Sequence, residues 1–137
     1  MKNVRGYNFS RPFFGERVPQ HVQNIVIKDF CNKNKLNFLL SATEYSMKES
    51  SHIINELVND IDNLFGIVAY SLFQLPSDKK IRKKILNKIL IKRKIIFFAC
   101  ENLQVSNRIE MSKIETLWNI KEVSERINYD RIYKNKI

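Results

Sequence analysis

Apolar positions follow two alternating spacings along the whole chain. Short runs rich in β-branched and aromatic residues predict strands, whereas apolar residues that recur every three or four positions predict amphipathic helices. Four such runs lie at residues 4–10, 37–44, 66–73 and 95–101. The segments between and after them have the helical spacing, so the pattern predicts helices near residues 19–34, 50–61, 79–94 and 106–127.

The third run, residues 66–73, is almost uniformly apolar, which is typical of a parallel strand buried on both faces. Repeated strand–helix units need right-handed crossovers, and these place helices on both faces of one parallel sheet. We therefore expect an α/β fold with three layers and a four-stranded, mainly parallel sheet of resolvase-like or flavodoxin-like type. The 137 residues predict one domain, with a core at about 4–105, a C-terminal helix at about 106–127 and a basic tail at 128–137.

Polar residues and a proline mark where helices should begin. Pro19 suits the first turn of the first helix, where its missing N–H costs nothing. Ser50 or Ser51 can cap the second helix, and Ser106 can cap the last one. On the last helix Trp118 is expected in the core or at a contact with a second subunit. The same two positions, core or subunit contact, are expected for the other apolar residues of this helix face, Ile109, Ile114 and Leu117.

Charge is concentrated in one segment. The net charge is +10, and residues 79–94 contain nine basic residues and no acid. One interpretation is a solvated helix face, since charge runs usually mark exposed faces. The other is a surface for nucleic acid, acidic lipid or an acidic partner. We favour the first, because the other face of this helix is expected to carry Ile81, Ile85, Leu86, Ile89 and Leu90.

Several classes of protein do not fit the sequence. It has no apolar run long enough for a membrane span and no apolar segment of signal-peptide type at its start, so we expect a cytoplasmic protein. Cys31 and Cys100 form no disulfide framework. Neither they nor His21 and His52 have metal-ligand spacing, so we expect no metal and no cofactor.

All four predicted strands end in polar residues. Ligands of open α/β sheets bind outside the carboxyl ends of the strands, so we expect a pocket at that edge. Arg11 and Arg17 bracket the turn before the first helix, whose free N–H groups favour an anion. Guanidinium groups can bind a phosphate or a carboxylate through two parallel hydrogen bonds, although both arginines can equally be solvated.

Three residues are candidates for catalysis. Ser10 is a candidate nucleophile, and His21, kept neutral by the helix dipole, is a candidate base. Glu44, after the second strand, is a candidate general base. The alternatives are that Ser10 caps a turn, that His21 faces solvent and that Glu44 closes the site through an ion pair. Further candidates for substrate binding are Gln20, Gln23, Tyr45, Ser71, Gln74 and Glu101.

Residues 4–105 resemble the catalytic domain of serine recombinases of the resolvase type. The segment Gly6-Tyr7-Asn8-Phe9-Ser10 is similar to the strand that carries their nucleophilic serine. Where the recombinases have an arginine before that serine, this chain has Asn8. Their Asp-Arg pair after the third strand corresponds to Phe73 and Gln74 here, and their next arginine corresponds to a position near Ser77. Phosphodiester exchange needs guanidinium groups on the transferring phosphate, so we expect this fold without recombinase activity.

A second resemblance covers nearly the whole chain. The segments RGYNFSRPF at residues 5–13, ERVPQHVQN at 16–24, LSATEY at 40–45 and GIVAYSLFQLP at 66–76 look like the sporadic carbohydrate cluster protein family. That family consists of small bacterial proteins encoded among genes for surface-polysaccharide and unusual-sugar synthesis. The resemblance implies a role in carbohydrate biosynthesis and leaves the reaction open.

Together these observations predict a protein of surface-polysaccharide or unusual-sugar biosynthesis. It is expected to bind, or to act on, a phosphorylated, nucleotide-activated or acidic sugar at the carboxyl edge of its sheet. The alternatives are an adaptor for a biosynthetic enzyme, docked through the basic helix, and a nucleic-acid-binding protein derived from a recombinase. A homodimer through the C-terminal helix is also plausible, because resolvase-like domains often pair through a late helix.

Overall fold

The computed structural model describes residues 1–133, so residues 134–137 of the expected basic tail lie outside it. Strands and helices alternate as the hydrophobic pattern predicts. The strands are β1 (Asn3–Phe9), β2 (Asn37–Glu44), β3 (Gly66–Ala69), β4 (Ile95–Phe98) and β5 (Leu103–Val105). The α-helices are α1 (Gln20–Lys33), α2 (His52–Asn59), α3 (Lys79–Ile91) and α4 (Arg108–Tyr133), with short 3-10 helices η1 (Ile61–Asn63) and η2 (Leu72–Gln74).

The strands form one sheet in the order β2-β1-β3-β4-β5, in which all neighbours are parallel except β4 and β5. The expected α/β class is therefore confirmed, with five strands instead of four. The fifth, β5, has only three residues and follows a turn in which Asn102 has a φ of +53°. Three residues are too few to show a strand periodicity, so the sequence pattern missed this antiparallel edge.

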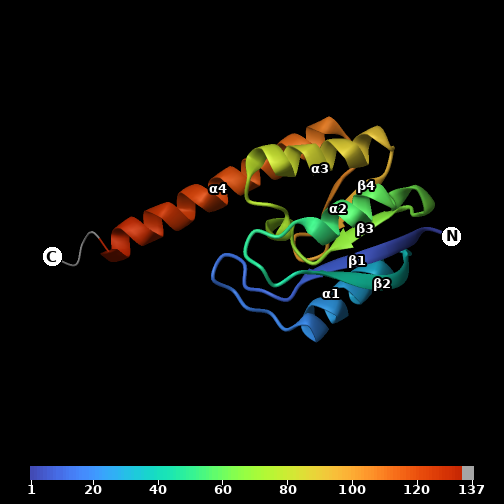
Figure 1. Cartoon of the computed structure of the whole chain (residues 1–137), viewed down its shortest axis with the longest axis horizontal. Coiled ribbons are helices and arrows are strands. Elements are labelled where there is room, and N and C mark those ends of the chain that lie inside the picture. The colour runs from blue at the N-terminus through green and yellow to red at the C-terminus, as the bar shows by residue number, and fades with distance from the viewer. Residues whose placement is uncertain (134–137) are drawn as a thin grey trace.

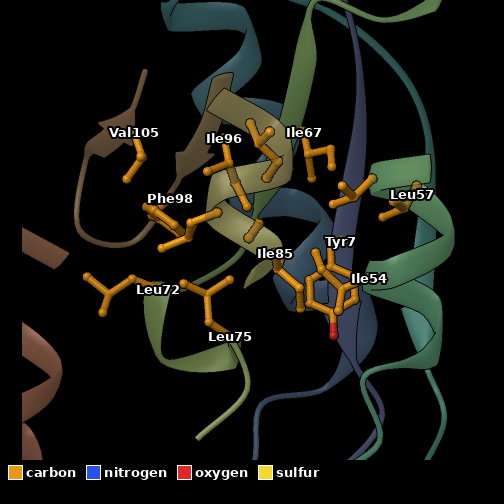
Figure 2. Packing of buried hydrophobic residues seen from close by; sticks show 14 of the residues in the cluster. Tyr7, Ile54, Leu57, Ile67, Leu72, Leu75, Ile85, Ile96, Phe98 and Val105 are labelled. Atoms are coloured by element: carbon orange, nitrogen blue, oxygen red, sulfur yellow. The ribbon is translucent and has the colours of Figure 1, made fainter. Parts of the chain in front are cut away.

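Helices cover both faces of the sheet, as expected for right-handed crossovers (Figure 1). On one face α1 packs against the sheet through a small core that includes Val4, Ile27 and Phe30. On the other face α2, α3 and the first half of α4 share the larger core. Figure 2 shows side chains from β1, α2 and α3 meeting there at Tyr7, Ile54 and Ile85.

The third and fourth strands are shorter than the apolar runs predict. β3 ends at Ala69, and the chain turns into η2 because polar groups hold that turn. The Ser71 hydroxyl accepts a hydrogen bond from the Phe73 N–H at 3.1 Å, and the Glu101 carboxylate accepts one from the Leu72 N–H at 2.8 Å. β4 ends at Phe98, where the chain turns back toward β5.

The last helix is longer than expected, because α4 continues from residue 127 to Tyr133. Asn107 caps its start, since its side-chain oxygen accepts the Glu110 N–H at 2.8 Å, whereas Ser106 hydrogen-bonds the Glu110 carboxylate. Trp118 is only 2% exposed, so its expected core position is confirmed. In the described part of the chain, no helix is both long and apolar enough to span a membrane.

The basic helix α3 is less uniformly exposed than expected. Arg82 is buried, and its guanidinium binds both oxygens of Glu115 on α4, at 2.9 and 2.7 Å. It also lies 4.4 Å above the ring of Trp118. Ile81, expected on the apolar face, is instead 43% exposed. Arginine is long enough to lie along an apolar surface and still reach a carboxylate, so a basic residue occupies an inward position here.

Candidate functional site

The loop between β1 and α1 carries a tight hairpin. The Phe13 N–H donates to the Glu16 carbonyl oxygen at 3.0 Å, and the Glu16 N–H donates to the Phe13 carbonyl oxygen at 3.0 Å. Phe14 and Gly15 between them have φ values of +48° and +74°, as in a type I′ turn. The ring of Phe14 packs against Phe73 and Trp118, with ring centroids 5.5 and 5.2 Å apart. The hairpin is therefore anchored on η2 and α4.

A cavity of about 460 Å³ lies on one side of this hairpin. Its walls come from the segments that follow β1, β2 and β3, together with α4, so it lies at the carboxyl edge of the sheet. The strand order reverses between β1 and β3, which makes this the switch point where open α/β sheets bind ligands. Five of the lining residues are aromatic, namely Phe9, Phe13, Phe14, Phe73 and Trp118. The others are Arg11, Pro12, Ser46, Lys48, Glu49, Leu75, Pro76 and Ser77.

Of the two candidate arginines, Arg11 and Arg17, it is Arg11 that lines this cavity. Its guanidinium donates to the carbonyl oxygens of Tyr45 at 2.8 Å, Met47 at 3.1 Å and Ser50 at 2.9 Å. It also lies 4.1 Å above the Phe9 ring. These hydrogen bonds use three of its five N–H groups. Among the described residues no carboxylate forms a direct ion pair with it.

A second, smaller cavity of about 190 Å³ lies on the other side of the hairpin. Phe13, Phe14 and Phe73 line both cavities and form the wall between them. The smaller cavity is more polar, and its other lining residues are Glu16, Tyr70, Ser71, Cys100, Glu101 and Lys121. Burial raises the pKa of the Tyr70 hydroxyl and of the Cys100 thiol, so neither is prepared to act as an anionic nucleophile at neutral pH.

Ser71 and Glu101 both reach the smaller cavity, but they bind each other. The Ser71 hydroxyl donates to a carboxylate oxygen of Glu101 at 2.7 Å. Gln23 and Gln74 are also brought together, beneath the loops and out of contact with solvent. The Gln74 amide donates to the Gln23 side-chain oxygen at 2.8 Å, and Gln23 further binds the Phe9 N–H and carbonyl oxygen. This pair connects α1, β1 and η2, which is a structural role.

The position of Glu44 does not fit the general base that we expected. Glu44 is 1% exposed, and its carboxylate accepts a hydrogen bond from the Tyr7 hydroxyl at 2.8 Å. It also accepts the N–H groups of Ile53 and Ile54, at 3.1 and 3.2 Å, and so caps the start of α2. Ser51 lies at the N-cap position of α2 but makes no side-chain cap bond. Burial and the charge of Glu44 raise the pKa of Tyr7, so this hydroxyl stays protonated.

The expected anion-binding corner is not assembled. The Ser10 hydroxyl donates to the Glu44 carbonyl oxygen at 3.1 Å and lines neither cavity. The side chains of Arg17 and His21 are exposed and make no hydrogen bond or ion pair within residues 1–133. Gln20 is likewise exposed, and the ring of Tyr45 stacks on His52 at 5.6 Å. Of the eleven candidate residues, Arg11, Ser71 and Glu101 line the cavities.

The aromatic wall is the feature that the sequence analysis missed. Phe13 and Phe14 come from a loop, where the hydrophobic pattern assigns no role to them, and Phe73, expected at the end of the third strand, lies in η2 instead. A signal was present, because Phe13 and Phe14 directly precede Gly15 between a strand and a helix. Two adjacent aromatic side chains before a turn glycine favour packing of the turn against another element, because large apolar side chains favour burial. Lys48 gave no such signal, since it lies in an ordinary polar loop.

The residues that stand in place of the charged residues of serine recombinases make structural contacts here. Asn8 is fully buried and binds the side chains of Asn24 and Thr43, at 2.9 and 2.6 Å. Phe73 belongs to the aromatic wall, and Gln74 is buried against Gln23. None of the three supplies a guanidinium group for a transferring phosphate.

Comparisons with known proteins support the fold. No protein-family model matches the chain, and no significant match was found among curated proteins. Among solved structures, the N-terminal catalytic domain of TP901-1 integrase is similar at a TM-score of 0.60 and 12% identity, over 90% of this chain and 98% of that one. A resolvase family site-specific recombinase from Streptococcus pneumoniae is similar at a TM-score of 0.62 and 13% identity, over 93% and 94% of the two chains. The expected resolvase-like fold is therefore confirmed, and at this identity the likeness concerns the fold alone.

Proposed function

We propose that the larger cavity binds a phosphorylated or nucleotide-activated sugar, and that the protein serves surface-carbohydrate biosynthesis through this binding. The observation that carries the proposal is that one cavity combines an aromatic wall with the guanidinium of Arg11, which forms no direct ion pair with a described carboxylate. Flat apolar rings pack against a nucleobase or against the C–H face of a sugar, while a guanidinium binds phosphate. A volume of about 460 Å³ lies within the usual range of small-molecule sites.

The rim of the cavity supports an anionic ligand. Lys48 adds a second positive charge beside Arg11, and Glu49 is engaged by the Ser77 hydroxyl at 3.0 Å. The Ser46 hydroxyl can donate to a sugar oxygen, and the Ser77 hydroxyl, which donates to Glu49, can accept a hydrogen bond from a sugar hydroxyl. The resemblance of four sequence segments to the sporadic carbohydrate cluster protein family implies a role in carbohydrate biosynthesis and leaves the ligand open. We limit the proposal to binding, because Ser10, His21 and Glu44 do not converge on the cavity.

A titration with UDP-glucose, glucose 1-phosphate and glucose, followed by NMR chemical shifts, tests the proposal. We expect the resonances of Phe13, Phe14 and Trp118 to shift with a phosphorylated ligand and to stay in place with glucose. Arg11→Gln should weaken binding at least about tenfold. Arg17→Gln is the matched control, because this arginine is exposed and lines neither cavity. The proposal fails if no phosphorylated ligand perturbs these residues, or if both arginine variants weaken binding equally.

An adaptor role is the second candidate, and the exposed face of α3 favours it. With Arg82 buried, an exposed cluster of four lysines remains at the start of the helix: Lys79, Lys80, Lys83 and Lys84. Replacing Lys80, Lys83, Lys84 and Lys88 by glutamate should abolish capture of a biosynthetic enzyme and leave UDP-glucose binding intact. Steeply salt-dependent binding of DNA by the unmodified protein would instead identify a nucleic-acid surface.

A further inference from the structure

A third cavity, of about 350 Å³, lies between the start of α3 and the middle of α4. We call it the α3–α4 cavity. All its lining residues are polar or charged, and two elements supply most of them: Lys79 and Arg82 of α3, and Glu115, Thr116, Asn119 and Glu122 of α4. The remaining one, Ser77, also lines the larger cavity beside the aromatic wall. The two cavities therefore adjoin each other at Ser77.

A buried arginine and a buried tryptophan separate the two cavities. Arg82 lines the α3–α4 cavity and Trp118 lines the larger one, and the Arg82 guanidinium lies 4.4 Å above the Trp118 ring. The same guanidinium donates to the carbonyl oxygens of Pro76 and Ser77, both at 3.0 Å. These bonds hold the segment at which the cavities meet, so the fold itself sets the relative position of the two cavities.

The two cavities differ in charge. In the larger cavity Arg11 and Lys48 outnumber Glu49, so its lining carries an excess of positive charge. The α3–α4 cavity has two basic and two acidic lining residues, and Arg82 binds both oxygens of Glu115 at 2.9 and 2.7 Å. Complementary charge therefore directs a phosphate to the larger cavity and leaves the α3–α4 cavity to an uncharged polar group.

The α3–α4 cavity also offers hydrogen-bonding groups of mixed type. Lys79, Asn119 and Glu122 line it, and within residues 1–133 their side chains make no hydrogen bond or ion pair. The Thr116 hydroxyl donates to the Ser112 carbonyl oxygen at 3.1 Å and can still accept. An ammonium donates, a carboxylate accepts and an amide does both. Such a set matches the hydroxyl groups of a sugar, because each hydroxyl both donates and accepts.

We propose that the ligand is a nucleotide-activated sugar that spans both cavities, with its nucleotide in the larger cavity and its sugar in the α3–α4 cavity. This inference rests on the proposed function and selects one of the two ligand classes named there. Because the sugar has a cavity of its own, the aromatic wall is left for a nucleobase, which a simple sugar phosphate does not carry. The diphosphate that joins nucleoside and sugar then lies on the Arg11 side of the junction at Ser77.

NMR titrations of the full chain with UDP-glucose and with UDP test this assignment. Both ligands should shift the resonances of Phe13 and Phe14, but only UDP-glucose should shift the side-chain amide of Asn119 and the methyl group of Thr116. Asn119→Ala should weaken binding of UDP-glucose at least about fivefold and leave the affinity for UDP unchanged. Asn128→Ala is the matched control, because this asparagine of α4 is exposed and lines neither of the two cavities.

The outcomes separate this inference from the proposed function. If UDP-glucose shifts the aromatic wall but not Asn119, and Asn119→Ala binds it as the unmodified protein does, the sugar lies elsewhere. This inference then fails while the proposed function stands. A shift of Asn119 with UDP alone would also overturn the inference, because the nucleotide would then occupy the α3–α4 cavity. If neither ligand shifts the aromatic wall, the proposed function fails and this inference fails with it.

Discussion

Glu44→Gln tests the structural role that we assign to the buried carboxylate at the end of β2. One oxygen of Glu44 accepts the Tyr7 hydroxyl and the Ile54 N–H, and the other accepts the Ser50 hydroxyl and the N–H groups of Tyr45 and Ile53. A glutamine has the same shape, but only one oxygen and no charge. Its amide nitrogen must therefore face at least one backbone N–H, whichever way it is oriented.

The expected cost follows from these contacts. Hydrogen bonds to a charged group are worth about 1 kcal/mol more than neutral ones, and a buried N–H left without a partner costs about 1–3 kcal/mol. Part of this is offset because the amide is easier to bury than a carboxylate. We expect a net loss of about 3 kcal/mol, which lowers the melting temperature of a domain of this size by about 12 °C.

Thermal unfolding followed by circular dichroism, with urea titrations at pH 7, measures this loss. Glu56→Gln is the matched control, because Glu56 also lies on α2 but its side chain is 58% exposed and pairs only with His52. An exposed pair of this kind contributes about 0.5 kcal/mol or less. If Glu44→Gln costs no more than Glu56→Gln, then Glu44 does not stabilise the fold and is again available as a candidate general base.

Three further outcomes are expected. Arg82→Lys should lower the free energy of unfolding in urea by about 2 kcal/mol, because lysine cannot bind both oxygens of Glu115; an unchanged midpoint would contradict this. Folding raises the pKa of Tyr7, so as the pH rises the unfolded chain loses this proton before the folded protein does. The free energy of unfolding should therefore fall above about pH 10, by up to about 1.4 kcal/mol per pH unit. Tyr7→Phe should reduce that slope. At pH 8 a thiol reagent should modify Cys100 in the folded protein faster than Cys31, because Cys100 is exposed whereas Cys31 is 1% exposed, although the pKa of both thiols is raised; equally rapid reaction of both would refute the buried position of Cys31.

The hydrophobic pattern was sufficient for the order and type of the main elements. The predicted range of β2 agrees with the structure at both ends, and Pro19 lies directly before α1. This agreement has a physical basis, because the periods of 3.6 residues in a helix and two in a strand are set by local backbone geometry, so the spacing of apolar residues indicates which element a segment forms. The pattern was wrong about the ends of β3 and β4. Glu101, distant in sequence, holds the turn after β3, and after β4 the chain turns back toward β5.

The candidate site divides in the same way. The sequence by itself determined that polar residues follow the strands and that parallel strands bring them to one edge of the sheet. It could not determine which of these residues would face a ligand and which would bind one another. Gln23 meets Gln74 across 51 positions of the chain, and Glu44 meets the Tyr7 hydroxyl across 37. Such pairings depend on the relative placement of whole elements, which no local spacing encodes.

The aromatic wall and the exposed apolar residues of α4 were also decided only by the tertiary structure. Phe14 of this wall and Trp118 are far apart in the sequence, and their rings meet because the hairpin after β1 lies against α4. Ile120 and Val123 have the same helical spacing as the core residues of α4, yet they are exposed because they lie on the face of the helix opposite Trp118, which packs into the core. An apolar residue is buried only where another element is there to cover it, and that depends on three-dimensional packing.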